Sequence, residues 1–322
     1  MREIQFIEAN KAKWKEFEHY LNGQNASLEP DRLAELYIQV TDDLSYTQTF
    51  YPSSKLLHYL NSLSVKAHQK IYANKREKAS RFKTFWKYEV PLAVKESYPE
   101  MLAALVIFLI AIAIGVFSSS QDAEYLKLIV GDDYVNTTQE NIDSGDPMAI
   151  YKSASSEAMF AKIAINNVRV SLTAFAVGIM TSIMPAFILM FNGIMVGAFL
   201  YHFVHKGLIG IALSTIFIHG ALELSCIVLA GGAGIVLGNS MLFPKTYSRV
   251  DSIVMGAKRA LKIMIGLLPI IVAAAFIESY FTRHYMEMGS IGRLTIIFIS
   301  FAFIIWYFII YPRQIKLDEH LS

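Results

Sequence analysis

The chain has 322 residues, of which 54% are hydrophobic and 17% are charged. Soluble domains carry about a quarter charged residues, so this composition, with its apolar residues gathered in long runs, excludes an ordinary soluble protein. The formal net charge of +2 identifies no class of partner, and the single cysteine excludes an intrachain disulfide. The N-terminus lacks a short apolar core followed by small residues, so no cleaved signal peptide is expected.

Residues 1–74 predict a cytosolic helical domain. Apolar side chains recur there at helical spacing, first at Leu33, Leu36 and Val40 and again at Leu56, Leu60 and Leu63. The pattern is typical of a small helical bundle packed on itself, and a docking platform for a partner is the alternative interpretation.

Residues 75–100 alternate basic and aromatic side chains and predict an interfacial helix at an anionic membrane surface. Its basic members are Lys75, Arg76, Lys78, Arg81, Lys83 and Lys87. Such a composition also occurs in nucleic-acid-binding segments. Its position directly before a spanning segment favours the lipid bilayer as the partner, and no nucleic acid is expected.

Residues 101–317 predict an all-α, polytopic membrane domain. A bilayer core of roughly 30 Å requires about 20 apolar residues in each helix, and six runs meet this requirement, near 101–117, 166–184, 186–204, 207–238, 260–280 and 291–311. The fourth run is long enough to be one steeply tilted helix or two helices broken at His219-Gly220.

The charges outside these runs predict the orientation. The loop over 118–165 is mostly acidic, whereas the loop over 239–262 and the segment before the first span are basic. Lys and Arg accumulate on the cytoplasmic side. Six spans then place both termini in the cytoplasm and the acidic loop outside it.

The fourth span carries two ionisable residues, His219 and Glu223, one helical turn apart. The same face continues through Cys226, Ala230, Gly234 and Gly238, so we expect it to face protein or a water-filled cavity. Asn192, in the preceding span, is predicted to complete an intramembrane polar cluster with His219 and Glu223. The glycines expected to pack helices together are Gly193, Gly197, Gly220, Gly234 and Gly238.

A second polar cluster is predicted near the outer side of the membrane. Asn166, Asn167 and Arg169 begin the second span, and Glu278 lies near the end of the fifth. Because these ends share one side of the membrane, Arg169 and Glu278 are a candidate ion pair.

Three interpretations of the intramembrane cluster compete: bonds that fix helix packing, a proton or ion path through Glu223 tuned by His219, and catalysis or metal binding. A His and a Glu four residues apart can ligate one metal. However, the HExxH pattern, a second such pair and a phosphate-binding loop are absent, so no metal, cofactor or enzymatic activity is predicted.

Several stretches resemble the stage II sporulation protein M family. They are NNVRVSLTAFAVGIMTSIMPAFILMFNGIMVGAF, IHGALELSCIVLAGGAGIVLG and AAAFIESYFT, and the cytosolic AKWKEFEHYL, LAELYIQVTDDLSY and LLHYLNSLSVKAHQKIY match the family as well. The resemblance implies a multi-span protein of the bacterial inner membrane. In spore formers the founding member is a scaffold for peptidoglycan-degrading partners.

From this resemblance we expect a non-enzymatic membrane scaffold that recruits or positions partners which remodel the envelope or cell wall. A proton- or ion-coupled transporter or channel using His219 and Glu223 is the alternative. The small-residue faces of two spans make a homodimer possible.

Overall fold

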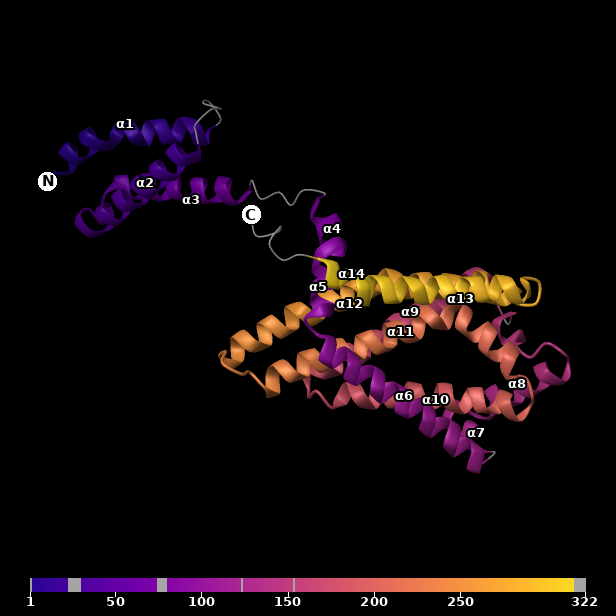
Figure 1. Ribbon diagram of the computed structural model, residues 1–322. Helices are drawn as coiled ribbons and strands as arrows, with labels where there is room; N and C mark the ends of the chain where they lie inside the picture. The colour runs from indigo at the N-terminus through magenta and orange to yellow at the C-terminus, as the bar shows by residue number, and fades with distance from the viewer. Residues whose placement is uncertain (1, 23–29, 74–79, 123, 153, 316–322) are drawn as a thin grey trace. The chain divides into compact units, whose positions relative to one another are not determined.

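The computed structural model describes residues 2–22, 30–73, 80–122, 124–152 and 154–315. The predicted basic residues Lys75, Arg76 and Lys78 and the end of the predicted membrane domain at 316–317 lie outside these ranges. The chain divides into two compact units, Met1–Arg81 and Phe82–Ser322 (Figure 1). The division lies within the segment predicted as one interfacial helix over 75–100.

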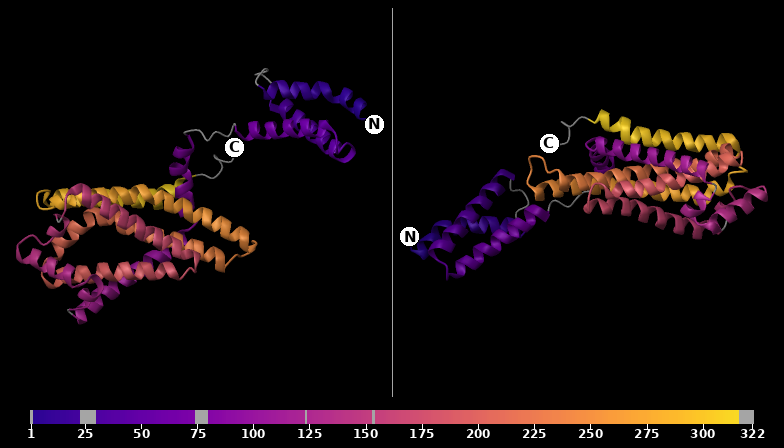
Figure 2. Two further views of the ribbon diagram at one scale, coloured as in Figure 1. Left: turned by 180° about the vertical axis from the view of Figure 1, so that it is seen from behind. Right: turned by 90° about the horizontal axis from the view of Figure 1, so that it is seen from below.

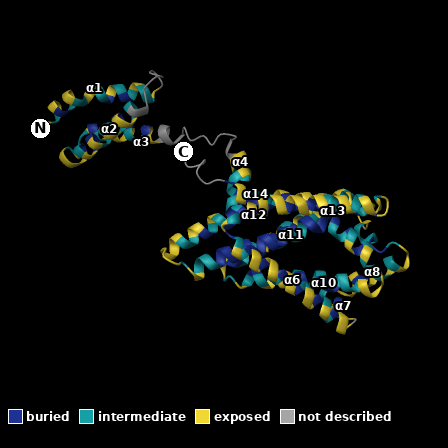
Figure 3. Cartoon of the chain, viewed as in Figure 1, coloured by how far each residue is buried: buried dark blue, intermediate teal, exposed yellow. Residues whose placement is uncertain are grey.

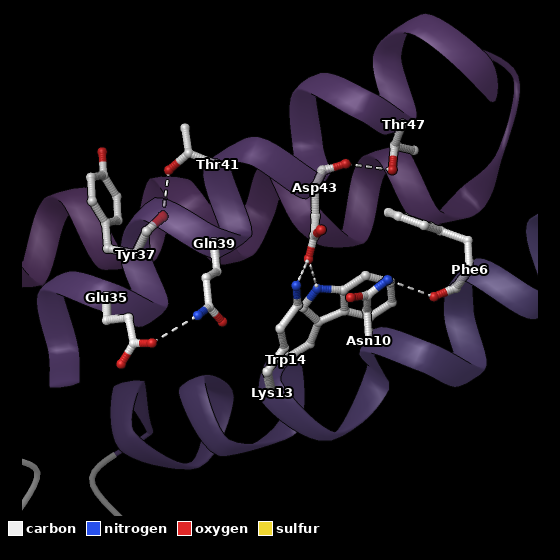
Figure 4. Close-up of polar contacts among 10 residues, drawn as sticks. All are labelled: Phe6, Asn10, Lys13, Trp14, Glu35, Tyr37, Gln39, Thr41, Asp43 and Thr47. Carbon is white, nitrogen blue, oxygen red and sulfur yellow. Dashed lines mark hydrogen bonds and ion pairs between the residues drawn. The ribbon is translucent and has the colours of Figure 1, made fainter.

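The first unit contains α1 (Glu3–Leu21), α2 (Pro30–Phe50) and α3 (Lys55–Ala73). All three helices contribute to one core, whose fully buried members include Phe17, Leu36 and Leu60. Figure 4 shows its main polar contact: the indole Nε1 of Trp14 donates to Asp43 Oδ2 over 2.7 Å, and Lys13 Nζ lies 2.8 Å from the same oxygen. The expected helical bundle is therefore held by an apolar core beside one partly buried ion pair.

The second unit is also helical, and the described residues contain no strand. Its long helices are α6 (Tyr98–Gln121), α9 (Ser156–Ala176), α10 (Met184–His205), α11 (Ile209–Leu242), α12 (Arg249–Tyr280) and α13 (Gly289–Ile305). Within the described chain, five helices are long and apolar enough to cross a membrane, namely α6, α10, α11, α12 and α13 with the turns that extend them. The chain is thus an all-α polytopic membrane protein.

All six long helices run between the same two ends of the unit (Figure 2). At the basic end, which contains the α11–α12 connection, Arg259 Nε lies 3.4 Å from Glu96 Oε2, and Tyr98 Oη donates to the Ile309 carbonyl. At the acidic end, which contains residues 118–155, Tyr285 Oη donates to Asp146 and Arg283 donates to Ser156. α9 begins at the acidic end and finishes beside Gly234 of α11, so it too runs between the ends.

α11 lies at the centre of the bundle and contacts α6, α9, α10, α12 and α13. Figure 3 shows it as the most continuously buried helix. It is one unbroken helix of 34 residues, so of the two predicted forms of the fourth span, the single long helix is the one observed. Gly220 does not interrupt it.

Two predicted spans have different bounds in the structure. The second, expected over 166–184, is α9 at 156–176, followed by a 3-10 turn over Val177–Ile179. Pro185 lies in the first turn of α10, a position that proline favours because no backbone N–H is needed there. The fifth, expected over 260–280, begins at Arg249, because its first three turns are helical despite their charge.

The segment before α6 is packed into the bundle. α4 (Ser80–Thr84), a π-helix (Phe85–Glu89) and α5 (Val90–Lys95) follow one another, and Val90 and Val94 are buried against α12. Lys262 Nζ lies 2.8 Å from Glu89 Oε2, and Tyr307 Oη donates to the Trp86 carbonyl. The second half of the predicted interfacial helix therefore contributes to the core at the basic end.

Candidate functional site

α11 and α12 bring three ionisable side chains together near the acidic end. His219 and Glu223 come from α11 and Glu278 from α12, and one ligating atom of each lies within 4.8 Å of the other two. His219 Nε2 is 3.8 Å from Glu278 Oε1. The side chains of His219 and Glu278 are 6% and 13% exposed, and Glu223 is partly buried, so this cluster, which we call the His-Glu-Glu cluster, lies largely within the protein.

Helix geometry explains the convergence. Residues four apart share one face of a helix, so His219 and Glu223 both face α12. α12 runs antiparallel to α11 from the basic end to the acidic end, and this brings its last turn level with His219. The next turn, Thr282–His284, adds Thr282, whose hydroxyl lies 3.1 Å from His219 Nδ1.

The Thr282 hydroxyl and His219 Nδ1 share a hydrogen bond whose direction depends on the tautomer of His219. Thr282 Oγ1 also lies 3.4 Å from the Ile277 carbonyl oxygen, and when it donates to this oxygen it acts as the acceptor towards His219. Nδ1–H of His219 is then the donor, and Nε2 is left with a free lone pair. That lone pair faces the carboxylate of Glu278.

Polar side chains on α9 and around the cluster lack partners. Asn167 is 4% exposed, its amide lies beside the Glu223 carboxyl, and its Nδ2 donates to no acceptor. Hydroxyl oxygens of Ser171, Thr215 and Ser279 are also buried without a hydrogen bond. Buried polar groups are normally paired, so this region of the described chain has an unusual excess of unused hydrogen-bonding groups.

Tyr151 covers the cluster from the acidic end. Its ring meets the His219 imidazole edge-on with centroids 5.4 Å apart. Burial, followed by the charge of Glu278, raises the pKa of the Tyr151 hydroxyl well above its ordinary value. The neighbouring Lys152 binds Asp146 over 2.6 Å, and Asp146 accepts from Tyr285 over 2.6 Å, so the turn that carries Tyr151 is fastened to the end of α12.

The two predicted polar clusters are combined differently in the structure. Asn167 and Glu278, predicted for the outer cluster, lie with His219 and Glu223. No hydrogen bond among the described residues joins Asn192 to them; its amide donates to the Ile188 carbonyl of its own helix over 2.8 Å. The predicted Arg169–Glu278 pair is not formed: Glu278 faces His219, and Arg169 is exposed beside Ile165 and Leu172 on the outer face of α9. Asn166 is exposed and donates to Asn167.

Four of the five predicted packing glycines lie where helix backbones touch. In α10, a Cβ added at Gly197 would lie 2.1 Å from the carbonyl oxygen of Ile112, and one at Gly193 would lie 2.8 Å from the carbonyl oxygen of Phe108. In α11, a Cβ at Gly234 would lie 2.3 Å from the carbonyl oxygen of Ala174, and one at Gly238 would lie 2.3 Å from the backbone nitrogen of Ser182. At Gly220 it would meet only side chains of its own helix, the nearest at 3.7 Å. Gly220 therefore makes no close helix contact.

In the His-Glu-Glu cluster, hydrogen-bond acceptors face one another. Two carboxyl groups and the free Nε2 converge in a site between α9, α11 and α12. These three groups could share a proton or serve as the ligands of a metal cation. Sequence spacing alone found the His219–Glu223 pair. It did not place Glu278 of α12 in this cluster, because Glu278 is 55 positions after Glu223 in the chain. It also missed Thr282 and Tyr151, which belong to no recognisable motif.

Comparison with known families agrees with the architecture. The family model described as Stage II sporulation protein M matches residues 104–283, more than half of the 322 residues. A model described as Domain of unknown function (DUF8413) matches residues 4–73, which corresponds to the first unit. No curated protein and no solved structure matches the chain. The chain belongs to the stage II sporulation protein M family.

Proposed function

We propose that this protein is a non-enzymatic scaffold of the bacterial inner membrane that recruits or positions envelope- or cell-wall-remodelling partners. Both termini, and with them the first unit, lie in the cytoplasm on this proposal, because the basic end of the membrane unit matches the side on which Lys and Arg accumulate. α9 then counts as the sixth crossing helix.

One observation supports a static scaffold in preference to a transport pathway. Beyond Glu223, the face of α11 that was predicted to line a path is packed directly on neighbouring backbones. Cys226, Ala230 and Ala233 are completely buried, and Gly234 and Gly238 touch Ala174 and Ser182. The His-Glu-Glu cluster is therefore followed, towards the basic end, by a closely packed seam of small and apolar side chains on this face of the helix.

Crosslinking in cells tests the scaffold. A photoreactive amino acid at Ile38, which is 60% exposed on α2, should capture one defined set of envelope proteins. The same amino acid at Phe298, 74% exposed on α13, is the control and should capture mainly lipid. The proposal fails if Ile38 captures no envelope protein, or if deletion of the whole protein leaves the captured partners correctly localised.

The competing function is proton or cation transport, and the enclosed His-Glu-Glu cluster is the observation that favours it. Flux across proteoliposomes between pH 5 and 8 distinguishes the two functions. We expect no flux above that of empty vesicles. Flux that Glu223→Gln abolishes, while Glu287→Gln on the exposed surface preserves it, would identify a transporter and exclude the static scaffold.

A further inference from the structure

The His-Glu-Glu cluster lacks the donor that its acceptors require. The 3.8 Å between His219 Nε2 and Glu278 Oε1 is too long for a hydrogen bond. In the tautomer that donates from Nδ1 to Thr282, Nε2 carries no proton. The Asn167 amide is the neighbour of Glu223, but its Nδ2 lies outside good hydrogen-bond geometry. Three acceptors that face one another in an enclosed site are stabilised by a cation between them.

Charge identifies the valence of that cation. Two ionised carboxyl groups and a neutral imidazole carry a total charge of −2, which is costly within a membrane protein. Among the described residues, no Lys or Arg side chain forms an ion pair with Glu223 or Glu278. One divalent ion makes the site neutral, as protonation of both carboxyl groups also would, whereas a single proton or a monovalent ion leaves one negative charge.

The ligand types identify the chemical class. Calcium and magnesium prefer shells made only of oxygen atoms, with six or more ligands. An imidazole nitrogen with two carboxylates suits zinc and its neighbours among the transition metals. A tetrahedral zinc ion with bonds of about 2.1 Å holds its ligand atoms about 3.4 Å apart. Small rotations of the two Glu side chains bring atoms that are already within 4.8 Å to that spacing.

The surroundings provide what a metal site needs outside its ligands. A ligating His usually donates its other ring nitrogen to an oxygen, and Thr282 accepts from His219 Nδ1 in this way. Asn167, more than nine-tenths buried and with an unused Nδ2 beside Glu223, supplies a donor for the carboxylate oxygen that does not bind the ion. This unpartnered amide is an observation independent of the cluster itself.

We propose that His219 Nε2, Glu223 and Glu278 together bind one divalent transition-metal ion, zinc by preference, at the acidic end of the bundle. The ion joins α11 to the last turn of α12 through ligands from both helices. This inference is independent of the scaffold function, because a static scaffold and a transporter both accommodate such a site.

Metal analysis of the purified full-length protein tests the proposal. After removal of metals with a chelator and incubation with Zn²⁺, we expect one zinc per chain by mass spectrometry. Glu223→Gln and Glu278→Gln keep the side-chain shape and should weaken zinc binding at least about 100-fold, since loss of an outer-shell partner alone costs 10- to 100-fold. Glu287→Gln, beside the exposed His284, is the matched control and should bind like the wild type.

A second measurement needs no variant, in case the cluster variants do not fold. X-ray absorption of the zinc-loaded wild type should show one imidazole and otherwise oxygen ligands. The proposal is overturned if the wild type binds no zinc, if both Gln variants keep wild-type affinity, if Glu287→Gln removes the metal, or if the spectrum shows two or more imidazoles.

Discussion

Asp146 joins three segments at the acidic end of the bundle. Its carboxylate accepts from Lys152 and from the Tyr285 hydroxyl, each over 2.6 Å. Partial burial raises the pKa of Asp146, but the hydrogen bonds from Lys152 and Tyr285 outweigh burial, so the pKa lies below its ordinary value. Because Tyr151 is the neighbour of Lys152, this contact also holds Tyr151 over His219.

The protonation state of Asp146 should control the order of this turn. A lowered carboxyl pKa means that the stabilisation is complete above the ordinary aspartate pKa and is lost as the pH falls through the folded-state value. Asp146→Asn should remove about 1–2 kcal/mol at neutral pH, and amide hydrogen exchange over residues 146–152 should become roughly 5- to 30-fold faster. Equal exchange in the variant and the wild type would contradict this role, and Asp143→Asn, on the exposed end of α8 (Asp132–Asp143), is the control.

At this scale the sequence predicted residue types better than it predicted partners. His219 and Glu223 are one turn apart, so their shared face followed from helix geometry alone. Glu278 joins them only because α12 packs antiparallel on α11, and no local sequence pattern predicts that helix packing. Asn192 has a local alternative, the carbonyl of Ile188. A side-chain amide in a helix can donate to the carbonyl one turn earlier, so the presence of an Asn in a span does not identify its partner.

Glycines determine how closely the long helices approach. α6 and α10 meet at Gly115, Gly193 and Gly197, where backbone atoms of one helix lie against the glycine of the other. α11 approaches α9 and the turn after it through Gly234 and Gly238. These are the two small-residue faces that made a homodimer possible, and both are used within one chain.

Single alanine substitutions should separate these glycines into two groups. Gly197→Ala places a Cβ 2.1 Å from the Ile112 carbonyl oxygen, and because backbone cannot move aside, we expect a loss of about 1–3 kcal/mol. Gly220→Ala and Gly210→Ala meet no backbone of another helix and should be neutral or stabilising by up to about 1 kcal/mol. Thermal unfolding in nanodiscs measures the difference, and a Gly197→Ala protein as stable as Gly220→Ala would contradict the packing argument.

The sequence predicted the existence of the long helices well and their ends less well. Runs of apolar residues identify the part of a helix that is in the bilayer, so α10 and α11 were found nearly complete. α12 begins 11 residues before its predicted start because its first turns are amphipathic and charged. Hydropathy does not register a helix that continues into a polar region. α9 ended early because Gly178 brings the chain against Gly234, which is a tertiary contact.

The whole molecule consists of two units with separate cores. The core of the first unit contains only residues of α1, α2 and α3, and a separate family model covers the same residues. Its aromatic side chains Phe6, Tyr46 and Tyr51 pack on one another with centroids 4.8 to 6.0 Å apart. A domain with its own core does not need the membrane unit to bury its apolar surface.

Residues 1–81 should therefore fold when produced alone. We expect a soluble helical protein with one cooperative unfolding transition in urea, of modest stability because a domain of this size buries little surface. Trp14→Phe removes the donor to the buried Asp43 carboxylate and should cost about 1–3 kcal/mol, whereas Ile38→Ala at an exposed site should change stability by about 0.5 kcal/mol or less. A gradual, non-cooperative transition would mean that the first unit depends on the membrane unit for its fold. Equal effects of the two substitutions would mean that the Trp14–Asp43 hydrogen bond contributes little to its stability.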